Sequence, residues 1–227
     1  MTAIVVIAKE CLPGKVKTRL HPPLSLEQAA NLAAASLADT LTVASRLPAT
    51  HHILAFDGMT PPLEAADWEI LPQTGGGLDE RLAAIFDHQD EPTLLLGMDT
   101  PQVSAAALAP VFTGWGEETD AWFGPADDGG FWALALKKPT GALLRGIPMS
   151  RSDTGAHQLQ RLDRAGLTVG LLPSLTDIDT IADARTVASI APHTRFARAF
   201  ADVRASALRD PADLHAAEIR ALSGERS

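Results

Sequence analysis

Short, continuous apolar runs alternate along the chain with longer stretches in which apolar residues recur at helical spacing. Such runs are typical of strands that are covered on both faces of a sheet. We predict strands over residues 3–8, 51–56, 68–71, 93–96, 120–124, 131–136 and 167–173. Helices are expected over 25–46, from 78 to about 88, over 104–112, before Gly166, and from 182 onward with breaks at Pro192 and Pro211. This alternation predicts an α/β fold.

Residues with known capping preferences mark several of these helix ends. Ser25 and Gln28 are three residues apart, as in a capping box at the start of the first long helix. Gly166 is placed to end a helix in a left-handed conformation. Asp183 falls in the first turn of the predicted helix after residue 180, where an acidic side chain acts as a cap or favours the helix dipole.

The composition narrows the class of protein. The chain has 227 residues, 46% of them hydrophobic, which is enough for a sizeable core. A net charge of -9 argues against a surface that binds nucleic acid or an anionic membrane, while a small anionic ligand stays compatible with it. Cys11 is the single cysteine, which excludes an internal disulfide. With no signal-peptide pattern and no apolar run long enough for a bilayer, we expect a cytoplasmic protein.

The segment PTLLLGMDTP, residues 92–101, is the strongest candidate for chemistry. Its apolar run ends at Gly97, and Asp99 follows in a turn closed by Pro101. The carboxyl ends of strands in an open α/β sheet are where ligands bind. Asp99 is therefore a candidate ligand, although Asp-Thr-Pro is equally ordinary turn chemistry.

The loop after the first strand, KECLPGKVKTRLHPP, is basic in an otherwise acidic chain. It carries Lys15, Lys17 and Arg19 close to Gly14, which permits close approach of the backbone. Lysine and arginine supply charge and forked donors for phosphate. We favour a phosphate-binding loop over a solvated basic loop because of its position at a strand end.

A glycine triplet, Gly75 to Gly77, leads into the predicted helix at residue 78. Bare backbone amides at a helix start favour an anion or the edge of a base. Gln73, which both donates and accepts hydrogen bonds, lies at the strand end, where a nucleobase could be recognised. A flexible loop is the alternative.

Two acidic clusters occur in the second half of the chain. Asp127 and Asp128 precede Gly129 and Gly130 in a turn, where turn propensity alone accounts for each residue type. In TDIDTIAD, residues 176–183, Asp177 and Asp179 alternate in an extended segment and are therefore expected on the same face.

Five motifs in this order, GKVKTRL, QTGGGLDERL, LLLGMDTP, GPADDGGFWALAL and TDIDTIADA, resemble the DUF2064 family of glycosyltransferase-like proteins. The resemblance implies the GT-A (nucleotide-diphospho-sugar transferase) fold, a three-layer α/β/α sandwich with a mostly parallel sheet. It covers residues 3 to about 190. We therefore expect one GT-A-like domain over 1–227, in which 192–227 form a C-terminal helical extension.

The resemblance also implies a site for a nucleotide and Mg²⁺ or Mn²⁺. In related folds the first loop holds phosphates and the glycine-rich loop lies near the base. One metal ligand is the aspartate after the central strand, and a second comes from the Asp-Thr element near the C-terminus. The DDGG turn faces the acceptor or the donor sugar. Carried over to this sequence, the phosphate ligands are Lys15, Lys17 and Arg19, the base contacts are Gln73, Gly75, Gly76 and Gly77, the metal ligands are Asp99 and Asp179, and the candidate bases are Asp127 and Asp128.

Three functions are compatible with these residues. The first is glycosyl transfer from a nucleotide-diphospho-sugar to a small acceptor, with Asp127 or Asp128 as base. The second is nucleotidyl transfer to a small phosphorylated or carboxylated acid, with the loop cations, Arg19 included, stabilising the transition state. The third is nucleotide binding without turnover. After the central strand the chain has Asp99-Thr100-Pro101 in place of the Asp-x-Asp of classical metal-dependent GT-A enzymes. The segment HPPLS after Arg19 lacks the Pro-Lys of sugar nucleotidyltransferases.

Overall fold

The computed structural model of the protein describes residues 2–113, 115–116 and 118–209. Seven strands form one sheet in the order β3-β2-β1-β4-β6-β5-β7. The strands are β1 Ala3–Lys9, β2 His52–Asp57, β3 Glu69–Pro72, β4 Thr93–Leu96, β5 Ala121–Pro125, β6 Phe131–Leu136 and β7 Val169–Leu171. The helices are α1 Leu26–Ala44, α2 Leu78–Asp87, α3 Ala105–Phe112, α4 Thr154–Arg164, α5 Ile181–Ile190 and α6 Arg195–Arg209, with short 3₁₀ helices η1 Thr18–Leu20, η2 Leu63–Ala65 and η3 Gly141–Leu143.

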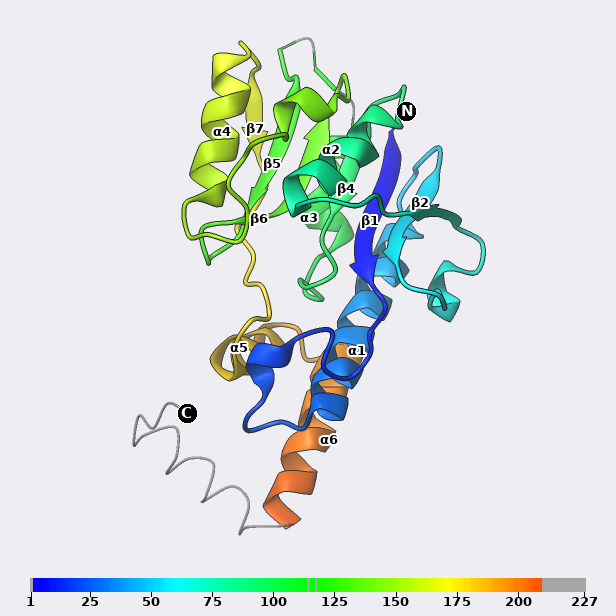
Figure 1. The fold of residues 1–227 in the computed structure, drawn as a ribbon, viewed down its shortest axis with the longest axis vertical. Coiled ribbons are helices and arrows are strands. Elements are labelled where there is room, and N and C mark those ends of the chain that lie inside the picture. Colours follow the sequence, from blue (N-terminus) through cyan, green and yellow to red (C-terminus); the bar gives the residue numbers. More distant parts are fainter. Residues whose placement is uncertain (1, 114, 117, 210–227) are drawn as a thin grey trace.

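The sheet is mostly parallel, as predicted. β1 pairs in parallel with both β2 and β4, and β6 is antiparallel to β4 and to β5 (Figure 1). The β1–β4 register runs from Ala3 opposite Thr93 to Val6 opposite Leu96. Because the two strands point the same way, the loops that follow them leave the sheet at the same edge, and this edge carries the site.

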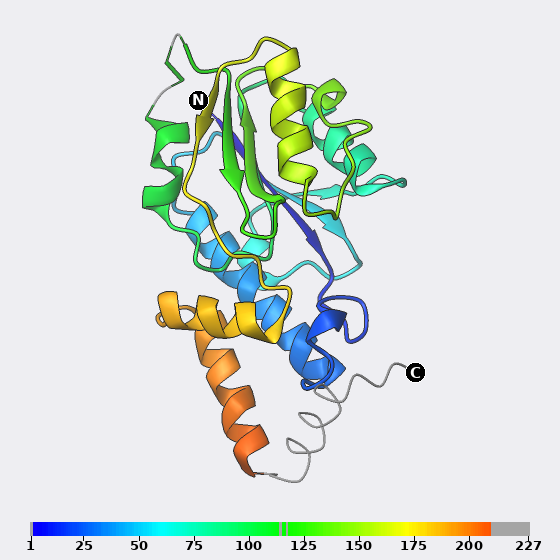
Figure 2. The ribbon, with the colours of Figure 1, turned by 90° about the vertical axis from the view of Figure 1, so that its left-hand side faces the viewer.

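Helices cover both faces of the sheet, which gives the predicted three layers (Figure 2). α1 and α3 lie on one face, over a buried cluster that includes Ile4, Leu41 and Leu108. α2 and α4 lie on the other face, over a cluster that includes Phe86 and Leu162. Burial of these apolar side chains at roughly 25 cal/mol per Å² is the main force that holds the layers together.

A third apolar cluster lies beyond the carboxyl edge of the sheet, where α5 and α6 pack against α1 and η1 (Figure 1). Leu20, Leu32, Ile178, Phe196 and Phe200 are its largest buried members. Since Leu20 comes from the first loop and Ile178 from the TDIDT segment, this cluster brings the two predicted ligand segments together. The helix α6 begins inside the predicted extension 192–227, and residues 210–227 lie outside the described residues.

The helix signals in the sequence are confirmed in detail. The Ser25 hydroxyl accepts from the Gln28 N–H, and the Gln28 side chain accepts from the Ser25 N–H, which is the predicted capping box. Thr180 and Asp183 form a second capping box at the start of α5. Gly166 has φ +74° directly after α4. Pro192 separates α5 from α6, and the predicted break at Pro211 lies outside the described residues.

The strand predicted over 167–173 is shorter than expected, because only Val169–Leu171 pair with β5. The segment after it is joined to β5 by backbone hydrogen bonds, in which Leu172 N–H donates to the carbonyl of Phe123 and Leu175 N–H to that of Pro125, and by an isolated bridge between Leu175 and Ala126. Among the helices that the structure describes, none combines the length and the apolar character that crossing a bilayer would need.

Candidate nucleotide and metal site

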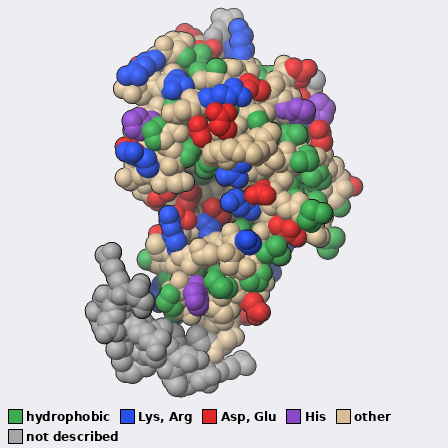
Figure 3. Space-filling view, in the orientation of Figure 1, with side chains coloured by type: hydrophobic (Ala, Val, Ile, Leu, Met, Phe, Trp, Pro, Cys, Tyr) green, Lys and Arg blue, Asp and Glu red, His purple; other side chains and the backbone are tan. Residues whose placement is uncertain are grey.

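A cleft of about 800 Å³ opens at the carboxyl edge of β1 and β4. In Figure 3 a hollow with basic and acidic side chains around it lies between the sheet and the lower helices. The charged side chains that line the cleft come from segments spread along the chain: Lys9, Lys15, Lys17, Arg19, Arg81, Asp99, Asp128, Arg151, Asp177, Asp179 and Asp183. The cleft therefore contains the predicted phosphate loop together with both predicted metal ligands.

The ammonium of Lys17 lies between the carboxylates of Asp99 and Asp179. Its Nζ is 2.9 Å from Asp99 Oδ2 and 3.2 Å from Asp179 Oδ1. The Lys17 side chain is only 9% exposed, and both carboxylates are 36% exposed. Burial acts to lower the pKa of Lys17, but the two carboxylates together outweigh it, so the net pKa of Lys17 is raised and the ammonium is charged.

Backbone and side-chain hydrogen bonds explain why these two aspartates converge. The N–H of Ile178 donates to the carbonyl of Asp99 at 3.1 Å. The Gln102 amide donates to the carbonyl of Thr176 at 2.7 Å. The turn after β4 is thus joined to the TDIDT segment on both sides of the site, and Asp99 and Asp179 share one cation although they lie far apart in sequence.

The other two cationic residues of the loop, Arg19 and Lys15, are less tightly held at the cleft than Lys17. Arg19 Nη1 is 2.9 Å from Asp179 Oδ2, and the Arg19 side chain is 72% exposed. Lys15 also lines the cleft, and in the part of the chain that the structure describes it forms no ion pair. Lys15 and Arg19 can therefore turn toward an anionic ligand at little cost in buried contacts.

The two aspartates of the DDGG turn are in different surroundings. Asp127 accepts hydrogen bonds from Ser174 Oγ at 2.7 Å and from Thr176 Oγ1 at 2.6 Å, which holds its pKa below the usual range. Asp127 does not line the cleft, whereas Asp128 does. Of the two predicted base candidates, only Asp128 therefore lines the cleft.

Asp177 has a raised pKa that the sequence did not predict. Burial, with the nearby charges of Asp99 and Asp128, raises the pKa of Asp177 to about 7. Its Oδ1 is buried without a hydrogen-bond partner among the described residues. The alternation of Asp177 and Asp179 pointed to one face, but only the packing of several carboxyl groups around one cleft gives Asp177 its unusual pKa.

Gln73 lines the cleft, but its polar atoms are already in use. Its amide Nε2 donates to the carbonyls of Ala8 at 2.8 Å and Ala55 at 2.9 Å, at the ends of β1 and β2. Its Oε1 accepts from Arg81 Nη1 at 3.0 Å. A base that contacts Gln73 would compete with these bonds. The side chain that Gln73 holds in the cleft is Arg81, whose Nε is buried and without a partner in the described residues.

The glycine triplet does not line the cleft. Gly76 has φ +100°, and Gly77 is the N-cap residue of α2. The role predicted for Gly75, Gly76 and Gly77 at a base stays a prediction. In the structure the triplet turns the chain between β3 and α2, and so presents Arg81 on the first turns of that helix.

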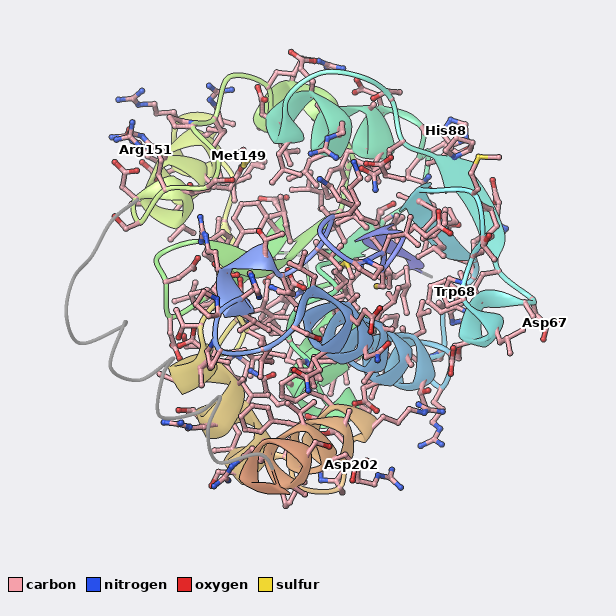
Figure 4. All side chains as sticks on the ribbon, turned by 60° about the horizontal axis from the view of Figure 1, so that its bottom comes forward. Asp67, Trp68, His88, Met149, Arg151 and Asp202 are labelled. Carbon is pink, nitrogen blue, oxygen red and sulfur yellow. The ribbon has the colours of Figure 1, made fainter. Side chains whose placement is uncertain are left out.

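An apolar wall and a cationic loop complete the cleft on the side of α4. Phe131 and Met149 line it, next to Arg151, Ser152 and Thr154. Met149 and Arg151 lie on the same side of the molecule, in the loop that leads into α4 (Figure 4). The sequence analysis assigned no role to this loop or to Arg81. Arg81 lies within the motif QTGGGLDERL, but only its glutamine and glycines were considered as ligand contacts.

The carboxylate oxygens fit a hard divalent cation. Asp99 Oδ1 is buried without a partner in the described residues, and oxygen is the ligand type that Mg²⁺ prefers. Within the described residues no group of three or more His, Cys, Asp or Glu side chains is arranged to hold a metal. Mg²⁺ sites commonly use one or two carboxylates, supplemented by water and substrate phosphates.

This sheet order, with a charged cleft at the carboxyl edge of β1 and β4, defines the fold class of the nucleotide-diphospho-sugar transferases. The chain belongs to the DUF2064 family, described as "Uncharacterized protein conserved in bacteria", whose model matches residues 31–151. A search of curated proteins found no match.

Solved structures support the fold. A protein of Desulfovibrio desulfuricans G20, described as a "putative nucleotide-diphospho-sugar transferase", is 25% identical, with 90% of this chain and 95% of that chain covered and a TM-score of 0.79. A 2-C-methyl-D-erythritol 4-phosphate cytidylyltransferase of Thermus thermophilus is 16% identical over 85% of this chain and 100% of its own, with a TM-score of 0.52. An inositol-1-phosphate CTP transferase of T. maritima is 13% identical over 83% of this chain and 94% of its own, with a TM-score of 0.53.

Proposed function

We propose that the protein is a metal-dependent transferase that takes a nucleotide-diphospho-sugar as donor and transfers the sugar to a small acceptor. The observation that carries this proposal is the convergence of Lys17, Asp99 and Asp179 in a cleft at the carboxyl edge of the sheet. The similarity to the Desulfovibrio desulfuricans protein supports the choice of donor.

In this proposal the diphosphate lies along the first loop, where Lys15 and Arg19 reach the cleft. Their charges stabilise the diphosphate as the bond between the sugar and its phosphate oxygen breaks. Asp99 and Asp179 hold Mg²⁺ or Mn²⁺, which when bound neutralises the phosphates. Arg81, held by Gln73, offers its free donors to the nucleobase.

The acceptor binds on the side of α4, next to Phe131 and Met149. Asp128 takes the proton of the attacking hydroxyl or thiol, because it faces the cleft while Asp127 is engaged by two hydroxyl groups. The protein is proposed to act as a single GT-A-like domain on small molecules, without nucleic acid or membrane partners, and in the cytoplasm.

Nucleotidyl transfer is the second candidate, because Lys15, Lys17 and Arg19 on one loop could equally stabilise the transition state of an attack on a triphosphate. In this reaction a phosphorylated or carboxylated acid attacks the α-phosphate of a nucleoside triphosphate and pyrophosphate leaves. Both reactions use the same cleft, and the released product distinguishes them.

A thermal-shift panel of nucleoside diphosphates, triphosphates and nucleotide sugars with Mg²⁺ or Mn²⁺ tests the proposal. A ligand that binds only the folded protein at about 100 times its Kd adds roughly 2.7 kcal/mol of stability and raises Tm. We expect Asp99→Asn and Asp179→Asn to abolish the metal-dependent part of the shift. Asp163→Asn, on the exposed face of α4, is the matched control and should keep it.

The donor is then incubated with candidate acceptors, and products are identified by mass spectrometry. Release of a nucleoside diphosphate supports glycosyl transfer, and release of pyrophosphate from a triphosphate supports the second candidate. If no nucleotide or nucleotide sugar shifts Tm with either metal, both candidates are refuted.

A further inference from the structure

The position of the Lys17 ammonium has a consequence for metal binding. Its Nζ is within 3.2 Å of one oxygen from each proposed metal ligand, and its side chain is 9% exposed. A carboxylate oxygen binds Mg²⁺ at about 2.0–2.1 Å. A divalent cation held by Asp99 and Asp179 would need carboxylate oxygens that the ammonium already contacts, so the two cations would compete for them.

The backbone of Lys17 is held in place, while its long side chain has the flexibility to reach more than one position. Lys17 has φ 47° and ψ 36°, a left-handed conformation that is uncommon for a residue other than glycine. Its carbonyl accepts from the Leu20 N–H at 3.0 Å, and the buried Leu20 anchors the loop in the third apolar cluster. The flexible four-carbon stem of lysine lets the ammonium move several ångströms without moving this loop.

The ammonium cannot simply leave, because the carboxylates need a counter-ion. Asp128 and Asp177 line the same cleft as the pair and add further carboxyl groups to it. Withdrawing the only cation that bridges Asp99 and Asp179 in the described structure would leave a partly buried cluster of negative charge, which is strongly unfavourable. Lysine must be exchanged for another cation.

A phosphate in the cleft supplies a destination for the displaced ammonium. Lys15 and Arg19 border the same cleft and would bind that phosphate together with Lys17. We propose that Lys17 is an internal counter-ion that occupies the Asp99–Asp179 pair in the free protein and passes to the nucleotide phosphate when a divalent cation takes its place. This inference rests on the proposed function.

Two effects follow. In the absence of nucleotide the protein binds Mn²⁺ weakly, because the metal must displace an ammonium that has no other partner. Nucleotide and metal then bind cooperatively, and each raises the affinity of the protein for the other by the same factor. The exchange also keeps the carboxylates together before the substrate arrives, so that the site is already shaped for the metal.

Lys17→Met tests the exchange, since methionine keeps most of the length of the stem without the charge. Free Mn²⁺ is titrated with protein and followed by electron paramagnetic resonance, first without nucleotide and then with saturating nucleoside diphosphate. We expect Lys17→Met to bind Mn²⁺ alone at least about tenfold more tightly than the wild type, and to lose most of the cooperativity between metal and nucleotide. Mn²⁺ should also raise its Tm more than it raises that of the wild type.

Lys15→Met separates exchange from a general effect of charge. It removes one positive charge from the same loop, but Lys15 forms no ion pair with Asp99 or Asp179 in the described structure. We expect it to change the affinity for Mn²⁺ alone by less than about threefold, the size of a screened surface interaction. The inference is overturned if Lys17→Met binds Mn²⁺ alone with the same affinity as the wild type or as Lys15→Met.

The outcomes distinguish this inference from the proposed function. If the wild type binds nucleotide with metal but Lys17→Met gains no affinity for Mn²⁺ alone, the counter-ion role is wrong and the proposed function stands. If neither protein binds Mn²⁺ with or without nucleotide, both proposals are wrong. A Lys17→Met protein that unfolds without metal and folds with Mn²⁺ supports the exchange, because the metal then replaces the missing cation.

Discussion

Gly129 of the DDGG turn is the position where a single methyl group should have the largest local effect. It has φ +88°, and a Cβ built there would lie 1.9 Å from the carbonyl oxygen of Ser152 in the loop before α4. The Gly129 carbonyl also accepts from the Gly155 N–H at 2.8 Å, so the turn and the start of α4 are in direct backbone contact. Gly129→Ala must push these two segments apart.

The loss of folding stability caused by Gly129→Ala has two contributions, and a control variant separates them. A non-glycine residue with positive φ costs about 1 kcal/mol. Forcing packed backbone segments apart adds about 1–3 kcal/mol, so Gly129→Ala should lower the free energy of unfolding by about 2–4 kcal/mol. Gly146 has φ +77° with nothing within 4 Å of the position a methyl group would take, so Gly146→Ala should cost only the first part, about 1 kcal/mol.

Urea unfolding of both variants and the wild type, monitored by circular dichroism, gives the free energies by linear extrapolation. Because Asp128 is adjacent to the turn and lines the cleft, Gly129→Ala should also weaken ligand binding, while Gly146→Ala should not. Equal destabilisation by the two substitutions would refute the argument that close packing against Ser152 requires glycine at position 129.

Three further predictions concern other parts of the molecule. Asp39 on α1 accepts from the first backbone N–H groups of α6, so Asp39→Ala should cost about 2–3 kcal/mol in urea unfolding, and Asp39→Asn less. Burial, followed by the charge of Asp99, raises the pKa of Cys11 to about 11, so iodoacetamide at about pH 8 should alkylate the folded protein roughly a hundredfold more slowly than the urea-unfolded chain. The Gly141 N–H holds the pKa of Asp87 below its usual range, so its ionised form stabilises the fold above the unfolded pKa, and this contribution is lost as pH falls through the folded pKa. Asp87→Asn should therefore destabilise the protein at about pH 6 and have little effect at about pH 2.5, as measured by thermal unfolding.

Most of the candidate site residues were predicted from their positions at the ends of strands. From the sequence, Asp99 is evenly balanced between a turn residue and a ligand, and the structure places it in the cleft with an ion pair to Lys17. Lys15, Lys17, Arg19, Asp128 and Asp179 also line the cleft, but their roles in binding and catalysis stay predictions. Asp127 and the glycine triplet Gly75 to Gly77 are the predicted residues that do not line the cleft.

The hydrogen-bond partners of Gln73 could not be predicted from its residue type. Its ability to donate and accept pointed to recognition of a base, and the same ability lets it join the ends of β1 and β2 and hold Arg81. A sequence states which groups a side chain carries, but the bonds that those groups make depend on which carbonyls the fold brings within hydrogen-bond distance.

The sequence by itself determined the helices and strands and indicated which loops after the strands carry candidate ligands. It could do so because apolar periodicity, caps and strand-end turns are local properties. Only the tertiary structure decided that Lys17 lies between Asp99 and Asp179, that the Oδ1 atom of Asp177 is buried and its pKa raised to about 7, and that Arg81 enters the cleft. The first of these facts depends on the packing of α5, α6 and η1 against α1, which brings residues 17 and 179 together. Contacts between distant segments, and the desolvation that they cause, have no periodic signal in the chain.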